Sequence, residues 1–218
     1  MCARKFISIS LYGSHPVYVL GALANAHLVP QVFPGWTMVL HCCLAETDST
    51  PFEALGCLVV GHPRSKLHSG MFWRFLSAWD LGAERVLFRD ADSRLNPREA
   101  AAVQAWERSG LDAHCMMDHP HHSQFPISGG MWGIKTGVLG HRLREECVAF
   151  GNRRQQRLRD MIWLRNRVHP VIQGSLLRHS SVPTKWPSCS WPDHLACEGF
   201  VGQQYNGEGN PVWPPVGG

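Results

Sequence analysis

The sequence predicts an α/β fold in which helices cover both faces of a mostly parallel central sheet, giving three layers. Short apolar segments without alternation, typical of strands buried on both faces, recur between longer segments with helical periodicity. The chain of 218 residues is 44% hydrophobic, which is enough to build one compact domain with its own core. The formal net charge is only +4 and 10% of the residues are aromatic, which excludes a disordered chain.

Four strands are expected in the first half of the chain, at residues 6–11, 38–40, 57–60 and 86–88. Ser14 is placed to cap a helix after the first strand, because Pro16 suits a first helical turn. Pro34-Gly35 predicts a turn after that helix. A second helix is expected over residues 70–79, where apolar side chains recur at helical spacing.

Two more strands are expected in the second half, at residues 113–117 and 131–135. A helix precedes them and runs from Asn96, a capping residue, to about Ser109, since Gly110 is a stop signal. The arginine-rich residues 142–167 are expected to form a solvated helical face, or else a surface that attracts an anionic acceptor.

Beyond Pro170 the chain is rich in Pro, Trp, Gly and Ser, which predicts an ordered but irregular region and a tail from about residue 180. We expect residues 1–218 to form a single domain. The end at Gly218, without a capping helix, fits one domain of a longer protein.

Several function classes lack their defining residues. There is no P-loop, no Gly-x-Gly-x-x-Gly after the first strand, no Gly-x-Ser-x-Gly and no His-Glu-x-x-His. The chain has no run of about 18 apolar residues, so no transmembrane helix is expected. Its basic charge is mild and it has no known nucleic-acid-binding motif, which argues against nucleic acid as a partner. The eight cysteines lack Cys-x-x-Cys spacing, so we expect reduced thiols in a cytoplasmic protein and no structural zinc.

Candidate ligand-binding residues follow the predicted strands, because ligands of such sheets bind at the carboxyl ends of the strands. The most informative is Asp90-Ala91-Asp92, directly after an apolar strand and before a capped helix. Two carboxylates two residues apart can hold one hard divalent cation, which can bridge the phosphates of a nucleotide. Alternatively, both pair with Arg89 and Arg94 and cap the following helix.

Collinear segments over nearly the whole chain match one group of enzymes. They include Ser10-Leu11-Tyr12-Gly13, Phe33-Pro34-Gly35-Trp36, Phe88 to Leu95, Ile127 to Gly133 and Gly199 to Gln203. The chain thereby resembles the nucleotide-sugar-dependent glycosyltransferases of the GT-A fold, and more narrowly a family of small transferases found in bacteria and large algal viruses. It departs from that pattern at Asp160-Met161, where relatives usually carry Asp-Gln.

The resemblance implies a GT-A fold and a metal-dependent enzyme that moves a hexose from a nucleoside diphosphate sugar to a hydroxyl of a glycan or glycolipid. The first choice of donor nucleotide is UDP. Asp90 and Asp92, with Ala91 between them, would hold Mn²⁺ or Mg²⁺ against the donor diphosphate. A histidine of the C-terminal region would add a metal ligand, with His179 as first choice and His194 as second. For a viral source the location would be the host cytoplasm; the sugar, the acceptor, and retention or inversion stay open.

Further donor contacts that the resemblance implies fall on Tyr12, Gly13 and Arg74. Tyr12 and Gly13 would hold the base and ribose, and Arg74 would contact the donor sugar or phosphate. The alternatives are a strand-end aromatic that packs on the following helix and a solvated helical arginine. Gly129 and Gly130 allow a sugar or acceptor to lie against the backbone, unless they only form a tight turn.

Asp118 ends a strand and can either deprotonate the acceptor hydroxyl or bind the donor sugar. If Asp118 is not the base, the neighbouring His119, His121 and His122 are the next candidates; Pro120 and the missing Cys-x-x-Cys make a zinc site weak.

Two other functions compete with glycosyl transfer. A nucleotidyltransferase would need a Gly-rich basic loop after the first strand, and intact Asp residues argue against a degenerate glycan-binding domain.

Overall fold

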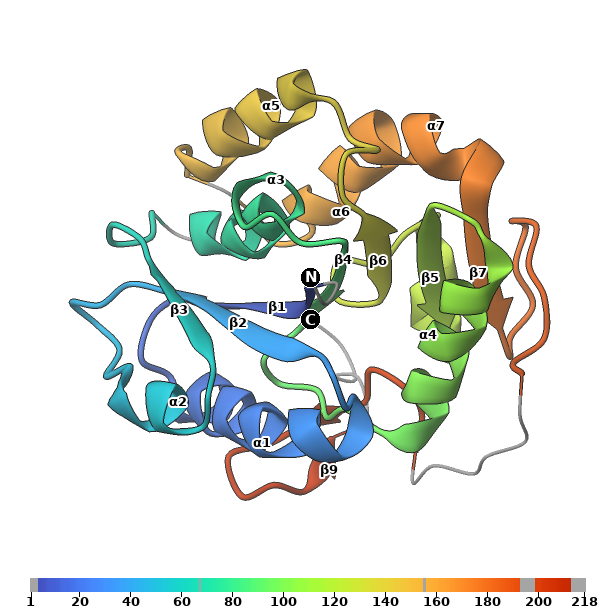
Figure 1. Ribbon diagram of the computed structural model, residues 1–218. Helices are drawn as coiled ribbons and strands as arrows, with labels where there is room; N and C mark the ends of the chain where they lie inside the picture. The colour runs from blue at the N-terminus through green and yellow to red at the C-terminus, as the bar shows by residue number, and fades with distance from the viewer. Residues whose placement is uncertain (1–3, 67, 155, 193–198, 213–218) are drawn as a thin grey trace.

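The computed structural model describes residues 4–66, 68–154, 156–192 and 199–212. Its centre is a seven-stranded sheet with the strand order β3-β2-β1-β4-β6-β5-β7 (Figure 1). The strands are β1 (Lys5–Leu11), β2 (Thr37–Cys42), β3 (Leu58–Gly61), β4 (Arg85–Arg89), β5 (Ala113–Met117), β6 (Trp132–Lys135) and β7 (Leu176–Ser180). Strand β6 is antiparallel to both β4 and β5, and the other pairs in this sheet are parallel. The predicted α/β class with a mostly parallel sheet is confirmed.

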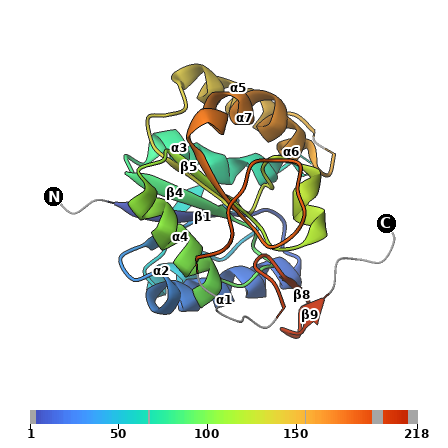
Figure 2. The ribbon, with the colours of Figure 1, turned by 90° about the vertical axis from the view of Figure 1, so that its right-hand side faces the viewer.

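Helices form a layer on each side of the sheet (Figures 1 and 2). One layer holds α1 (Pro16–Val32), α2 (Thr50–Ala54) and α4 (Pro97–Ser109). The other holds the 3-10 helix η1 (Ser69–Leu76), α3 (Ser77–Asp80), α5 (His141–Gly151), α6 (Arg159–Trp163), the π-helical turn η3 (Leu164–Val168), α7 (His169–Ile172) and the 3-10 turn η4 (Gln173–Ser175). A further 3-10 helix, η2 (Pro120–Gln124), follows β5. None of the helices in the described ranges is long and apolar enough to cross a membrane.

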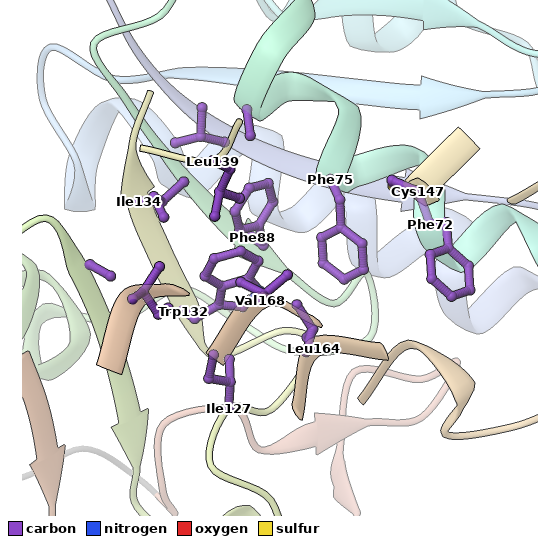
Figure 3. Close-up of a cluster of buried hydrophobic side chains, with 14 of the residues drawn as sticks. Phe72, Phe75, Phe88, Ile127, Trp132, Ile134, Leu139, Cys147, Leu164 and Val168 are labelled. Atoms are coloured by element: carbon purple, nitrogen blue, oxygen red, sulfur yellow. The ribbon is translucent and has the colours of Figure 1, made fainter. Parts of the chain in front are cut away.

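Each helix layer has its own apolar core against the sheet. On one face, Ile7, Ile9 and Leu11 of β1 pack with the buried residues of α1 and α4. On the other face, an aromatic cluster joins η1 to β4 and β6 (Figure 3), where the rings of Phe88 and Trp132 have centroids 4.4 Å apart. This packing fixes η1, which carries Arg74, against the middle of the sheet.

The chain passes from β1 to β2 on one side and later to β4 on the other, and both neighbours are parallel to β1. The chain therefore leaves the adjacent carboxyl ends of β1 and β4 toward opposite edges of the sheet, through α1 to β2 and through α4 to β5. Such a switch point is where ligands bind in open α/β sheets.

One cap and three regions differ from the sequence-based expectation. His15, not Ser14, caps α1, its Nδ1 accepting from the Val17 N–H at 3.3 Å. The predicted helix over 70–79 is a 3-10 helix followed by the short α3. The arginine-rich region divides into α5, which ends at Gly151, and α6 with η3; Leu158, in the left-handed conformation with φ 69°, is the N-cap of α6. The region beyond Pro170 contributes the edge strand β7 and a small hairpin of β8 (Gln204–Tyr205) and β9 (Pro211–Val212).

Candidate active site

A cleft of about 540 Å³ lies at the carboxyl ends of β1, β4 and β5. This volume lies within the range of about 300–1,000 Å³ that small-molecule sites occupy. Of the predicted site residues, it is lined by Tyr12, Arg74, Asp90, Ala91, Asp92, Gly129 and Gly130. Gly13, Asp118 and His179 are not among its lining residues.

Arg74 is the central charge of the cleft. Its guanidinium donates to Oδ1 of Asp90 and to Oδ2 of Asp160, the latter at 3.0 Å. The residue is only 5% exposed, so the alternative of a solvated helical arginine is excluded. A buried guanidinium needs such partners, because an unpaired charge in the interior is strongly destabilising.

Two serines of β1 hold the backbone of Arg74. Ser8 Oγ donates to the Arg74 carbonyl and the Arg74 N–H donates to Ser10 Oγ, both at 2.8 Å. These hydroxyls explain why a buried strand carries polar residues at alternate positions. They fix the backbone from which the Arg74 guanidinium reaches Asp90.

Asp90 and Asp92 face the cleft in different environments. The Asp90 side chain is 49% exposed, whereas Asp92 is 9% exposed and accepts a hydrogen bond from Gln204 Nε2 at 2.9 Å. Burial, followed by the neighbouring Asp90 charge, raises the pKa of Asp92 to about 6. Two close carboxylates of this kind favour a divalent cation that offsets their repulsion.

In the structure, Asp90 and Asp92 do not form ion pairs with Arg89 and Arg94, the alternative that the sequence left open. Arg89 instead forms a buried ion pair with Glu99 of α4, and Arg94 lies over the Tyr205 ring at 4.8 Å. Asn96 caps α4, its Oδ1 accepting from the Glu99 N–H at 2.9 Å. The carboxylates of Asp90 and Asp92 are thus left to the cleft and its side chains.

Gly129 and Gly130 allow the loop before β6 to approach these carboxylates. A Cβ at Gly130 would lie 2.0 Å from Asp90 Oδ2, and one at Gly129 would lie 2.5 Å from Asp160 Oδ2. Neither glycine has a positive φ. Close approach to the acidic groups, rather than turn geometry, therefore requires glycine at both positions.

Tyr12 lines the cleft and packs on η1, with its ring edge-on to Trp73 at 6.4 Å. Burial raises the pKa of its hydroxyl to about 12, so it stays protonated and can donate a hydrogen bond to a ligand. Gly13 follows with φ 76° and supplies the left-handed turn after β1 without lining the cleft.

The structure places His179 inside the sheet, where its register partner on β5 is Met116. The residue is 3% exposed and its Nδ1 lies 2.9 Å from His114 Nε2. A strand-interior position keeps this imidazole away from the loops at the strand ends, so it does not join Asp90 and Asp92. His194, the second choice, lies outside the described residues.

Asp118 is engaged by other parts of the chain. Arg98 of α4 donates to both of its oxygens, at 3.1 Å to Oδ2 and 2.9 Å to Oδ1. The Val201 N–H donates to Oδ2 at 2.9 Å and the Ser181 hydroxyl donates to Oδ1. A carboxylate held by four donors ties β5 to α4 and the C-terminal segment, which differs from the expected position beside a substrate.

The histidines after β5 do reach the cleft. His119, His121 and His122 all line it, and His119 stacks on Phe200 at a centroid distance of 4.4 Å. Burial lowers the pKa of His119, and lowers that of His122 to about 4. Both imidazoles are therefore neutral near pH 7, the state in which a ring nitrogen can accept a proton.

Sequence reasoning missed Asp160 and Gln204 as cleft residues. Asp160 is buried, and burial raises the pKa of its carboxyl. Its only sequence signal is the resemblance at Asp160-Met161. Gln204 lies in the region expected to be irregular, where no periodicity points to a site. Among the described residues, no group of three His, Cys, Asp or Glu side chains could hold a metal ion.

Comparisons with known proteins show the fold. No family model matches the chain, and no curated protein matches it. Among solved structures it is similar to an active-site mutant of LgtC, with 10% identity, a TM-score of 0.51, and coverage of 81% of this chain and 73% of that one. The chain has the GT-A glycosyltransferase fold.

Two further solved structures are similar at lower TM-scores. One is a glycosyltransferase involved in glycosylation of the major capsid of PBCV-1, with 13% identity, a TM-score of 0.49 and 81% of each chain covered. The other is mannosyltransferase PcManGT from Pyrobaculum calidifontis in complex with GDP-Man and Mn²⁺. It shows 15% identity and a TM-score of 0.47 over 66% of this chain. The present chain spans about half of that mannosyltransferase, 47% of its length.

Proposed function

We propose that this protein is a metal-dependent glycosyltransferase that moves a hexose from a nucleoside diphosphate sugar to a hydroxyl acceptor. The observation that supports it is the arrangement of Asp90, Asp92 and the buried Arg74 around one cleft at the switch point of a GT-A sheet. UDP is the proposed nucleotide, and a glycan or glycolipid the proposed acceptor, on the resemblance alone. The narrower family of small bacterial and viral transferases stays a prediction.

The donor set fits a hard divalent cation, because Asp90 and Asp92 offer oxygen atoms and Mn²⁺ and Mg²⁺ accept oxygen ligands. A cation held by these two carboxylates would supply the positive charge that stabilises a diphosphate leaving group. Arg74 holds Asp90 in place through its ion pair. Removal of the cation should therefore abolish donor binding without unfolding the protein.

The sugar end of the donor is proposed to lie against Gly129 and Gly130. Their missing side chains leave backbone beside Asp90 and Asp160, and Asp160 is held by Arg74 with one oxygen and by the Met161 N–H with the other. A buried carboxylate fixed in this way can accept hydrogen bonds from sugar hydroxyls. Tyr12 would lie beside the nucleotide.

Acceptor deprotonation is assigned to the cleft histidines rather than to Asp118. His119, His121 and His122 line the cleft, whereas Asp118 uses both oxygens for Arg98 and its neighbours. A general base has to reach the proton that it removes, which favours a cleft-lining group.

A nucleotide-sugar-binding domain without transfer activity is the second candidate. Met161 favours it, because this side chain lines the cleft where related transferases usually carry an amide. The two candidates agree on donor binding and differ in chemistry.

The test measures donor binding and donor hydrolysis with the same protein. Titration calorimetry with UDP-glucose should show binding in Mn²⁺ and none in EDTA, and Asp90→Asn and Asp92→Asn should each remove the Mn²⁺-dependent part. A transferase without acceptor should also release UDP slowly as water takes the place of the acceptor. Binding with no UDP release, even with a panel of glycan acceptors, would favour the binding domain. Equal binding in EDTA would contradict the cation.

A further inference from the structure

The hairpin of β8 and β9 lies against the loop that carries Asp90 and Asp92. Gln204 forms an antiparallel bridge with Ser93, and the Tyr205 N–H donates to the Asp92 carbonyl at 2.9 Å. The ring of Tyr205 lies under the Arg94 guanidinium. Three contacts therefore fix the backbone of Gln204 beside Asp92, although the two residues are 112 positions apart.

The side chain of Gln204 points from this anchored backbone to the acidic site. Its Nε2 donates to Asp92 Oδ2 at 2.9 Å, and the residue lines the cleft. A half-turn of the amide plane exchanges Nε2 and Oε1 in almost the same volume. The nitrogen faces the carboxylate in this structure, because the amide and carboxylate oxygens would repel each other. With a cation between them, the oxygen is the favourable atom.

We propose that Gln204 supplies Oε1 as the third protein ligand of the divalent cation held by Asp90 and Asp92. The inference rests on the cation of the proposed function and assigns a residue to it that no motif indicates. Its amide has two uses: a hydrogen-bond donor that holds Asp92 in place, and an oxygen ligand once the cation binds.

Other candidates for this position are placed elsewhere. His179 lies within the sheet and contacts His114. Asp160 uses one oxygen for Arg74 and the other for the Met161 N–H. Within the described part of the chain, His, Cys, Asp and Glu side chains do not gather as a group of three. A search restricted to those four residue types omits amides, which are ordinary ligands of hard cations.

An amide ligand has consequences that a histidine ligand would not have. The site becomes entirely oxygen, so Mg²⁺ and Mn²⁺ should both bind. The two aspartates then neutralise the cation, and the amide, unlike a third carboxylate, adds no negative charge to repel the donor diphosphate. A histidine at the same position would favour Mn²⁺ over Mg²⁺.

The experiment measures Mn²⁺ binding to the full chain by electron paramagnetic resonance, with UDP present, for the wild type, Gln204→Ala and Gln204→His. We expect Gln204→Ala to weaken Mn²⁺ binding by at least about tenfold, because loss of even a residue that only hydrogen-bonds a metal ligand typically costs 10–100-fold in affinity. In Gln204→His, pulsed measurements should detect coupling of Mn²⁺ to a directly bound imidazole nitrogen, and competition by Mg²⁺ should weaken. Gln124→Ala, which removes another cleft amide, is the matched control and should bind Mn²⁺ as the wild type does.

Thermal unfolding of each variant checks that the fold is intact. Unchanged Mn²⁺ affinity in Gln204→Ala would overturn the assignment, as would a folded Gln204→His that binds Mn²⁺ without nitrogen coupling. A wild type that binds neither Mn²⁺ nor Mg²⁺ would overturn the cation of the proposed function together with this inference. Failure confined to the variants overturns the inference alone.

Discussion

Replacement of Asp118 by asparagine separates a structural carboxylate from a catalytic one. The Asp118 side chain is 6% exposed and that of Arg98 17%, so the pair is shielded from solvent. Removal of one member of a buried pair costs about 3–5 kcal/mol, because the remaining charge is left unpaired. Asparagine keeps one oxygen for the Val201 N–H or the Ser181 hydroxyl and Arg98 keeps some solvent, so we expect a loss of about 1–3 kcal/mol.

A change of this size is measurable in a chain of 218 residues. Each kcal/mol lowers Tm by about 2–4 °C at this length, so Asp118→Asn should melt about 2–12 °C below the wild type. Arg98→Met should be destabilised too, and the double variant should lose less than the sum of the two, because the second change removes a charge that the first left unpaired.

Donor hydrolysis without acceptor, measured at a temperature at which both proteins are folded, distinguishes the structural role of Asp118 from a catalytic one. The structural role predicts that folded Asp118→Asn releases UDP from UDP-glucose within a few-fold of the wild-type rate. A variant that melts with the wild type but loses about 10²–10⁴ in rate would refute this reasoning and restore Asp118 as the general base.

Two further predictions concern the loop before β6 and a buried histidine. Gly130→Ala should abolish Mn²⁺-dependent UDP binding in calorimetry, because its Cβ would lie 2.0 Å from Asp90 Oδ2; Gly140→Ala, with no atom within 4 Å of the added Cβ, is the matched control. If Gly130→Ala binds UDP as the wild type does, the close approach of Gly130 to Asp90 has no role in donor binding. Burial lowers the pKa of His41 to about 3, so the folded state resists protonation of this residue and stability should fall as pH drops below about 6.5. Urea unfolding at several pH values between 7 and 5 gives the free energy of unfolding as a function of pH. This free energy should change less steeply with pH in His41→Gln than in the wild type, by up to about 1.4 kcal/mol per pH unit. An equal pH dependence would contradict the lowered pKa of His41.

The sequence was sufficient to predict the sheet up to β6 and the position of the acidic loop. Continuous apolar segments mark strands buried on both faces, and the rule that ligands bind at strand ends selects Asp90 and Asp92 without any tertiary contact. The rule also selects Tyr12 and the glycines before β6. These predictions depend only on local periodicity and chain order, which the sequence contains directly.

The missed strand β7 and the misplaced His179 share one cause, which is that polar residues are buried in this strand. β7 contains Arg178 and His179, which are 4% and 3% exposed. A strand with such residues lacks the apolar pattern, so the sequence predicts an irregular region there, in which His179 could reach the cleft. The sequence does not contain the information that His114, on the neighbouring strand, is the hydrogen-bond partner.

Asp118 shows why a position at a strand end does not by itself establish a catalytic role. Asp90 and Asp118 both follow strands of the same sheet, and both lie within reach of an arginine. Arg74 approaches Asp90 from the buried η1 and leaves half of its side chain exposed to the cleft, whereas Arg98 of α4 spans both oxygens of Asp118. Which carboxylate remains available to a ligand is decided by the direction from which the arginine arrives. That direction depends on how η1 and α4 pack on opposite faces of the sheet, and no local sequence pattern encodes it.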